Sequence, residues 1–275
     1  MARDLYSRIV ELDDATLRTV AEVLELRGRH PQQTAIRDAY LGALGDLTGL
    51  RVLDVGCGTG VVTRELARRV GPSGQVAGVD PSPVFVETAA RLATEHGLTN
   101  VGFAVQDGRQ LPYPDGSFDL ATAVTVLCHV PERAEVLAEL ARVTRPGGVV
   151  LIVDGDYASN QIEHPDRALT TRLVDAWRAS VVDDPHLMRR IIPLIEAAGL
   201  EPGSVNGYVH VETGNVDEAT SFIWQWALFA ARQATGAGAI TESEAAGWIE
   251  QLGDLKQRAE LFGSVTYVGV AARRV

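Results

Sequence analysis

The stretch VLDVGCGTG, residues 52–60, constrains the fold of this chain more than any other segment. Its apolar and β-branched start is typical of a buried strand, and an amphipathic segment, residues 61–70, follows directly. The glycines at 56, 58 and 60 suit a tight turn between the two. A strand, a glycine loop and a helix form a cradle whose backbone amides face an anion or a nucleotide, although the same pattern also fits a turn without a ligand.

The alternation that begins there continues for about a hundred residues. Short apolar runs at 51–56, 75–80, 101–107, 118–127 and 147–154 alternate with amphipathic segments. Such a rhythm predicts βαβ crossovers and a mostly parallel sheet with helices on both faces. The fold class is therefore α/β, of the Rossmann-like kind.

The two ends of the chain follow another pattern. Residues 1–48 read as helices and are expected to form an N-terminal helical lid over the main domain, residues 49–275. A helical insertion is expected at about 155–199, where Pro193 should kink its second helix. Two late strands, 203–213 and 263–275, enclose late helices at about 217–252, with a capping box at Thr241 and Glu244.

Composition narrows the choice of function. A net charge of −11 disfavours a non-specific grip on nucleic acid or on an anionic membrane. The chain has two cysteines, Cys57 and Cys128, no signal-peptide pattern and no run of 18 apolar residues. We therefore expect a cytoplasmic protein with a small-molecule partner, and the sequence leaves a homo-oligomer open.

The carboxylate of Asp54 at the mouth of the loop decides between ligands. A pyrophosphate would be repelled by it, and the spacing is G-x-G-x-G, not the G-x-G-x-x-G of dinucleotide folds. An ammonium and a sulfonium would be attracted, which points to S-adenosylmethionine. Asp80 and Asp107 end the next two strands, where they could accept hydrogen bonds from ribose hydroxyls and the adenine amine. Taken singly, each of these two acids also fits a helix cap or a turn.

Residues 50–154 resemble the class I S-adenosylmethionine-dependent methyltransferases, through VLDVGCGTG, GVD, QDGRQLPYPDGSFDLATAVTVLCHVPE and VTRPGGVVLIVD. Within that family, the chain most resembles small-molecule methyltransferases of the menaquinone and ubiquinone biosynthesis type and their natural-product relatives. The resemblance implies a seven-stranded sheet with an antiparallel last strand, and S-adenosylhomocysteine as product. It implies cofactor contacts from the loop, the strand-end acids and their neighbours: Asp54, Gly56, Cys57, Gly58, Gly60, Asp80, Pro81, Asp107 and Gly108.

The acceptor side is less defined. His129, just past the fourth strand, is the candidate general base, and contact with the cofactor or a helix cap is the alternative. His164, His186 and His210 have no comparable placement and are expected at the surface or in packing. The resemblance places the acceptor pocket among the N-terminal helices and the insertion, with Tyr6, Tyr40, Asp156, Tyr157 and Trp226 as candidates.

Two further points concern the pocket and the reaction. Trp226 belongs to a stripe with Phe222 and Phe229 that also fits plain core packing. No Cys/His cluster has metal-ligand spacing, so no metal is expected. The predicted function is methyl transfer to an O-, C- or N-nucleophile of a quinone-like or secondary-metabolite acceptor. A cyclase or other non-methylating enzyme on this fold, or a non-catalytic binding module, is the alternative.

Overall fold

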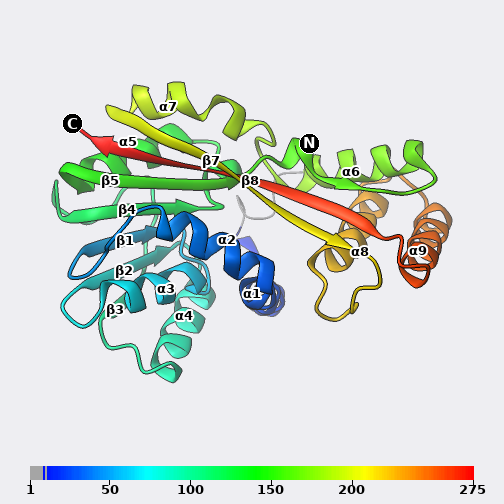
Figure 1. Cartoon of the computed structure of the whole chain (residues 1–275), viewed down its shortest axis with the longest axis horizontal. Helices are drawn as coiled ribbons and strands as arrows, with labels where there is room; N and C mark the ends of the chain where they lie inside the picture. Colours follow the sequence, from blue (N-terminus) through cyan, green and yellow to red (C-terminus); the bar gives the residue numbers. More distant parts are fainter. Residues whose placement is uncertain (1–8, 10) are drawn as a thin grey trace.

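The computed structural model describes residue 9 and residues 11–275, and it has one continuous sheet at its centre (Figure 1). The sheet is eight-stranded, with the order β3-β2-β1-β4-β5-β8-β6, and β7 pairs with β8. Its first five strands are parallel to one another: β1 (Arg51–Val55), β2 (Gln75–Asp80), β3 (Val101–Val105), β4 (Phe118–Val124) and β5 (Thr144–Gly155). The predicted parallel α/β sheet is confirmed.

The late strands run antiparallel. β8 (Phe262–Arg274) pairs antiparallel with β5 on one edge and with β7 (Leu200–Thr213) on the other. The antiparallel last strand is thus confirmed, while the count differs by one. The extra strand is β6 (Gln161–Ile162), which pairs with β8 over two residues and is too short to leave a periodic pattern in the sequence.

Helices pack on the parallel strands in two groups. α3 (Val61–Val70) and α4 (Pro83–Glu95) pack on β1, β2 and β3. α5 (Arg133–Val143) packs on β4 and β5 and contacts α7 (Ile191–Ala197). The predicted second helix of the insertion is divided, because a 3-10 turn, η4 (Leu187–Arg190), precedes α7, whose third residue is Pro193.

A second group of helices lies beyond the parallel strands. α6 (Arg167–Val181), α8 (Phe222–Gly236) and α9 (Glu242–Gln257) pack on one another, on the right of Figure 1, where β7 and β8 extend. Their buried side chains belong to the same core as the sheet. The capping box predicted at Thr241 and Glu244 is confirmed at the start of α9.

The two N-terminal helices differ in how they are held. α2 (Pro31–Gly42) contributes Ile36, Tyr40 and Leu41 to the main core. α1 (Asp14–Arg29) packs instead on α4 through a small separate cluster that includes Leu17 and Ala21. α1 is therefore the more separable of the two. None of the helices in the described part of the chain is long and apolar enough to cross a membrane.

Candidate cofactor and acceptor site

The glycine loop connects β1 to α3 at the carboxyl edge of the parallel strands. Gly56, Gly58 and Gly60 have φ values of 67°, 52° and 80°, a left-handed conformation that favours glycine. A Cβ at Gly56 would lie 2.5 Å from a methyl of Val126, so the close approach also requires glycine there. The backbone amide of Cys57 donates to the carbonyl of Val79 at 3.0 Å, which ties the loop to β2.

Asp80, the last residue of β2, holds the loop from the side. Its Oδ2 accepts the amide of Gly58 at 2.9 Å and its Oδ1 accepts the amide of Ser82 at 2.9 Å. Burial raises the pKa of Asp80 to about 6, while the hydrogen bonds from Ser82 and Gly58 oppose the rise. Each carboxylate oxygen accepts a single hydrogen bond from the protein, so lone pairs remain on both oxygens for further donors.

Asp54 is engaged inside the protein. It is 2% exposed, and its two oxygens accept hydroxyl hydrogen bonds from Thr63 at 2.6 Å and from Thr122 at 2.7 Å. Burial raises its pKa to about 6, against the effect of both hydroxyls, and the nearby charge of Asp80 adds to the rise. Asp54 therefore ties β1 to α3 and β4. Sequence reasoning missed Thr63 and Thr122.

Asp107 follows β3 at the same edge, in a different environment. Its side chain is 48% exposed and forms an ion pair with Arg109 at 2.6 Å. The hydrogen bond from Arg109 lowers the pKa of Asp107. Next to it, a Cβ at Gly108 would lie 2.7 Å from Val55, so the backbone passes close to the end of β1. The three acids thus lie at the ends of neighbouring strands, and Asp107 is the most accessible of them.

His129 lies in a 3-10 turn, η2 (Leu127–His129), directly after β4. It is 8% exposed, and its ring centroid is 6.2 Å from that of Tyr157. The turn is fixed by Asp154, which accepts the amide of Cys128 at 3.0 Å. The structure therefore brings His129 and Tyr157 together at the carboxyl edge of β4 and β5.

The other candidates for acceptor contacts are more dispersed. Tyr40 is buried on α2, and burial raises its pKa well above the usual range. The carboxylate of Asp156 is paired with Arg189 at 3.0 Å. The ring of Trp226 packs edge-on against Trp177 at 5.1 Å, in the core. Tyr6 lies outside the described residues.

Residues from α1 also reach this region, and sequence reasoning missed them. Arg27 donates to the hydroxyl of Thr125 at 3.5 Å. Thr125 follows β4 with a φ of 55°, an uncommon value for a β-branched residue and one found at functional sites. Glu25 forms a buried ion pair with Arg64 of α3, and Arg64 also donates to the carbonyl of Thr59 in the glycine loop. Arg64 thus links α1 to the glycine loop, through an ion pair with Glu25 and a hydrogen bond to the carbonyl of Thr59.

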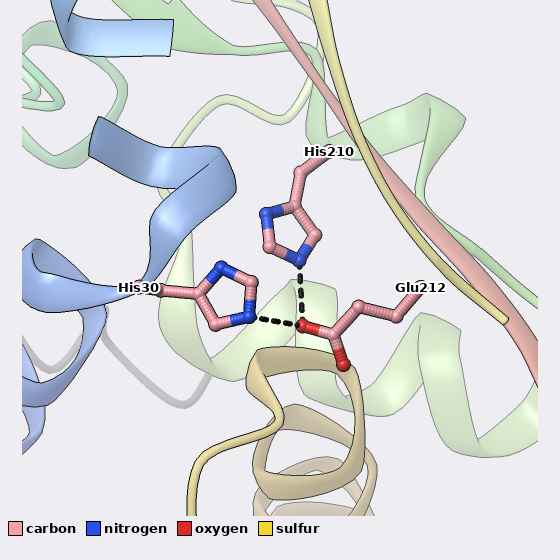
Figure 2. A group of neighbouring side chains, drawn as sticks. All are labelled: His30, His210 and Glu212. Carbon is pink, nitrogen blue, oxygen red and sulfur yellow. Dashed lines mark hydrogen bonds and ion pairs between the residues drawn. The ribbon is translucent and has the colours of Figure 1, made fainter. Parts of the chain in front are cut away.

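A separate polar cluster joins the α1–α2 junction to β7 (Figure 2). His30 and His210 both place Nε2 next to Oε1 of Glu212, at 3.0 Å and 2.8 Å. Burial acts to raise the pKa of Glu212, but hydrogen bonds from His210 and Ser221 outweigh it and lower the pKa to about 2. Burial lowers the pKa of His30. The three possible ligand atoms of this cluster lie within 4.8 Å of one another, a spacing that a metal ion could bridge. Sequence analysis did not find this cluster because 180 positions separate His30 from His210.

Comparisons with known proteins agree with this geometry. Residues 52–148 match a family described as a methyltransferase domain. The demethylmenaquinone methyltransferase of Lactococcus lactis is 41% identical over 114 residues, covering 42% of this chain and 45% of that protein. The 2-methyl-6-phytyl-1,4-hydroquinone methyltransferase of Synechocystis is 34% identical over 171 residues, covering 61% and 52%. The chain thus spans only about half the length of these curated relatives.

A solved structure extends the likeness over most of the fold. The [4+2]-cyclase SpnF superposes with a TM-score of 0.56 and 27% identity, covering 87% of this chain and 80% of that one. The sheet order, the glycine loop with Asp80 and the matched domain lead to the same answer. Residues 52–148 therefore form a methyltransferase domain, within a sheet architecture like that of the class I S-adenosylmethionine-dependent enzymes.

Proposed function

We propose that this protein transfers the methyl group of S-adenosylmethionine to a small-molecule acceptor. The observation that carries the proposal is the glycine loop, with its amides at the carboxyl edge of the sheet and the buried carboxylate of Asp80 bonded to Gly58. The charges of Asp54 and Asp80 favour a cationic ligand at this edge over a pyrophosphate. The sulfonium loses its methyl group to the acceptor nucleophile, and S-adenosylhomocysteine is the leaving product.

We propose the cofactor contacts residue by residue. Gly56, Gly58 and Gly60 lie beside the methionyl part, Asp80 binds the ribose and Asp107 lies near the adenine. Cys57, Pro81 and Gly108 contact the cofactor through their positions next to these residues. Support comes from their shared place at the ends of β1, β2 and β3.

The acceptor is proposed to be quinone-like or a secondary metabolite, with an O-, C- or N-nucleophile. Two curated relatives are named for quinone or hydroquinone methylation, which supports this class. His129, Tyr157 and Tyr40 are proposed to line the acceptor side, with Trp226 in the wall behind Trp177. His129 acts as general base if the acceptor must lose a proton in the transfer. The transfer itself is proposed to need no metal.

A cyclisation on the same fold is the second candidate. The observation in its favour is the likeness to the [4+2]-cyclase SpnF, which covers 80% of that chain. Such an enzyme would keep the glycine loop and Asp80 but release no S-adenosylhomocysteine.

Calorimetry and product analysis test both candidates. The purified protein should bind S-adenosylmethionine and not NAD; tight NAD binding without a S-adenosylmethionine signal would overturn the proposal. Incubation with a panel of hydroquinones, phenols and amines should yield S-adenosylhomocysteine and an acceptor heavier by one CH2 group. A converted acceptor of unchanged mass, with no S-adenosylhomocysteine, would favour the cyclase. Asp80→Ala serves as the cofactor-deficient control in both assays.

A further inference from the structure

His30 comes from a distant part of the chain and meets His210 and Glu212 at the N-terminal end of α8 (Figure 2). His210 and Glu212 are two positions apart on β7, so they share a face of that strand, and His30 reaches them from the α1–α2 junction. We propose that these three side chains form a binding site for a divalent cation of the zinc type, which fastens the α1–α2 junction to β7. The proposal is independent of the proposed methyl transfer.

The donor set and its spacing fit zinc. Two imidazoles and one carboxylate are ligands that zinc uses in open sites, at about 2.0–2.2 Å. Tetrahedral bonds of that length place neighbouring ligand atoms about 3.3 Å apart. Here the two Nε2 atoms lie 3.0 Å and 2.8 Å from Oε1, and all three ligand atoms lie within 4.8 Å of one another. The two nitrogen-to-oxygen distances are therefore within a few tenths of an ångström of those in a tetrahedral zinc site.

The charge at this place also favours a cation. Glu212 is 6% exposed, and its only ion-pair partners among the described residues are the two histidines. Its other donors are neutral: the hydroxyl of Ser221 and the amides of Phe222 and Ile223. A buried carboxylate without a lysine or arginine partner is stabilised by a metal ion more than by dipoles alone.

Access from solvent is present. A hollow of about 360 Å³ is lined by His30 and Glu212, together with Asp217 and Ser221. It leaves His30 and Glu212 open on one side, where a water molecule could complete a tetrahedral set, while His210 is fully buried behind them. An ion could therefore enter without unfolding of the core.

The hydrogen-bond partners of the two Nδ1 atoms favour metal binding by one histidine and disfavour it by the other. Nδ1 of His210 lies 3.3 Å from the side-chain amide of Gln33, which can turn its oxygen toward an Nδ1–H, as zinc-bound histidines require. Nδ1 of His30 instead accepts the amide of Gln32 at 3.3 Å, and metal binding through Nε2 would place a proton there. His30 is thus the weakest of the three ligands.

Without a cation, the same residues form a hydrogen-bonded clamp with a proton on each Nε2. Only the metal site predicts saturable zinc binding, so a zinc titration distinguishes it from the hydrogen-bonded clamp. The first experiment titrates EDTA-treated, full-length protein with zinc sulfate in a calorimeter. We expect one equivalent bound with a Kd of micromolar or below, and a rise in Tm on zinc addition because the ion binds only the folded state.

Variants assign the site. Glu212→Gln and His210→Gln should each weaken zinc binding at least 10-fold, and His30→Gln less than either. His96→Gln, at the exposed C-cap of α4, is the matched control and should leave the Kd unchanged. Equal losses in the control and in the site variants would overturn the proposal.

Spectroscopy on the wild type keeps the test decisive if a variant fails to fold. Cobalt(II) bound here should show the visible absorption of a tetrahedral nitrogen and oxygen site. X-ray absorption of the zinc-loaded protein should report two imidazoles and no sulfur. The absence of saturable binding at 100-fold excess over a micromolar Kd, or sulfur ligation by Cys57 or Cys128, would leave the cluster as a hydrogen-bonded clamp and refute the metal site.

Discussion

The buried ion pair between Glu25 of α1 and Arg64 of α3 allows a direct test of how α1 is held. Nη2 of Arg64 lies 3.0 Å and 2.9 Å from the two carboxylate oxygens, and Nη1 donates to the carbonyl of Thr59 at 2.6 Å. The side chains are 6% and 10% exposed. Glu25→Gln keeps the shape but leaves a buried guanidinium facing a neutral amide.

The expected magnitude follows from burial. Removing one partner of a buried pair typically costs about 3–5 kcal/mol, because the other charge stays desolvated. α1 is otherwise held by a small apolar cluster that includes Leu17 and Ala21, apart from the main core. The variant can therefore relieve the penalty by releasing α1 while the sheet stays folded. A loss of about 3 kcal/mol corresponds to roughly a 150-fold increase in opening of this helix.

Hydrogen exchange with mass spectrometry on peptides that cover residues 14–29 measures that opening. Exchange in α1 should rise about 100-fold or more in Glu25→Gln, while exchange in the parallel strands changes little. Cofactor affinity should fall, since Arg64 also holds the glycine loop at Thr59. Glu95→Gln is the matched control, because its i,i+4 pair with Arg91 is about half exposed, and it should change stability by less than about 0.5 kcal/mol.

Two results would refute this reasoning. If hydrogen exchange in α1 is as slow in Glu25→Gln as in the wild type, apolar packing alone holds the helix. A double variant, Glu25→Gln with Arg64→Met, removes the stranded charge and should recover part of the loss. If it is as open as the single variant or more so, the buried charge is not the cause.

Five further outcomes are expected. Asp80→Ala should weaken S-adenosylmethionine binding by about 1.5–3 kcal/mol, measured by calorimetry, and an unchanged Kd would remove Asp80 from the ribose site. His129→Ala should lower kcat by about 100-fold with little change in cofactor affinity if it is the base; weaker binding with intact kcat would instead indicate a positioning role. Because the pKa values of Asp54 and Asp80 are raised to about 6 in the fold, cofactor affinity should fall as the pH drops from 7 to 5 and the carboxylates take up protons. Their contribution to stability has the opposite sign, since between pH 3.8 and about 6 the folded state holds protons that the unfolded state has released. Their part of the free energy of unfolding should therefore decrease as pH rises through that window, and urea titrations of the wild type and of Asp80→Ala measure the share of Asp80 as the difference. Deletion of residues 1–29 should leave a folded core with little activity, because α2 remains in the main core; full activity would show that α1 is no lid.

Much of this fold could be predicted from local patterns in the sequence. The period of the apolar runs, the three glycines and the capping box at Thr241 depend on neighbours a few residues apart, so they can be read without knowing how the chain packs. The same holds for the place of Asp80 and His129, because the end of a parallel strand lies at the ligand edge wherever the strand is in the sheet.

Other features exist only through packing. Asp54 faces Thr63 and Thr122 and not a solvent-exposed pocket. This orientation depends on the register of β1 against β4 and on the position at which α3 packs on the sheet. Glu25 meets Arg64 across 39 positions, and His30 meets His210 across 180. No local periodicity encodes such pairs, because each residue alone fits an ordinary exposed helix or strand position. Tertiary structure decided them by bringing α1 onto α3 and the α1–α2 junction onto β7, where burial makes each charge depend on its partner.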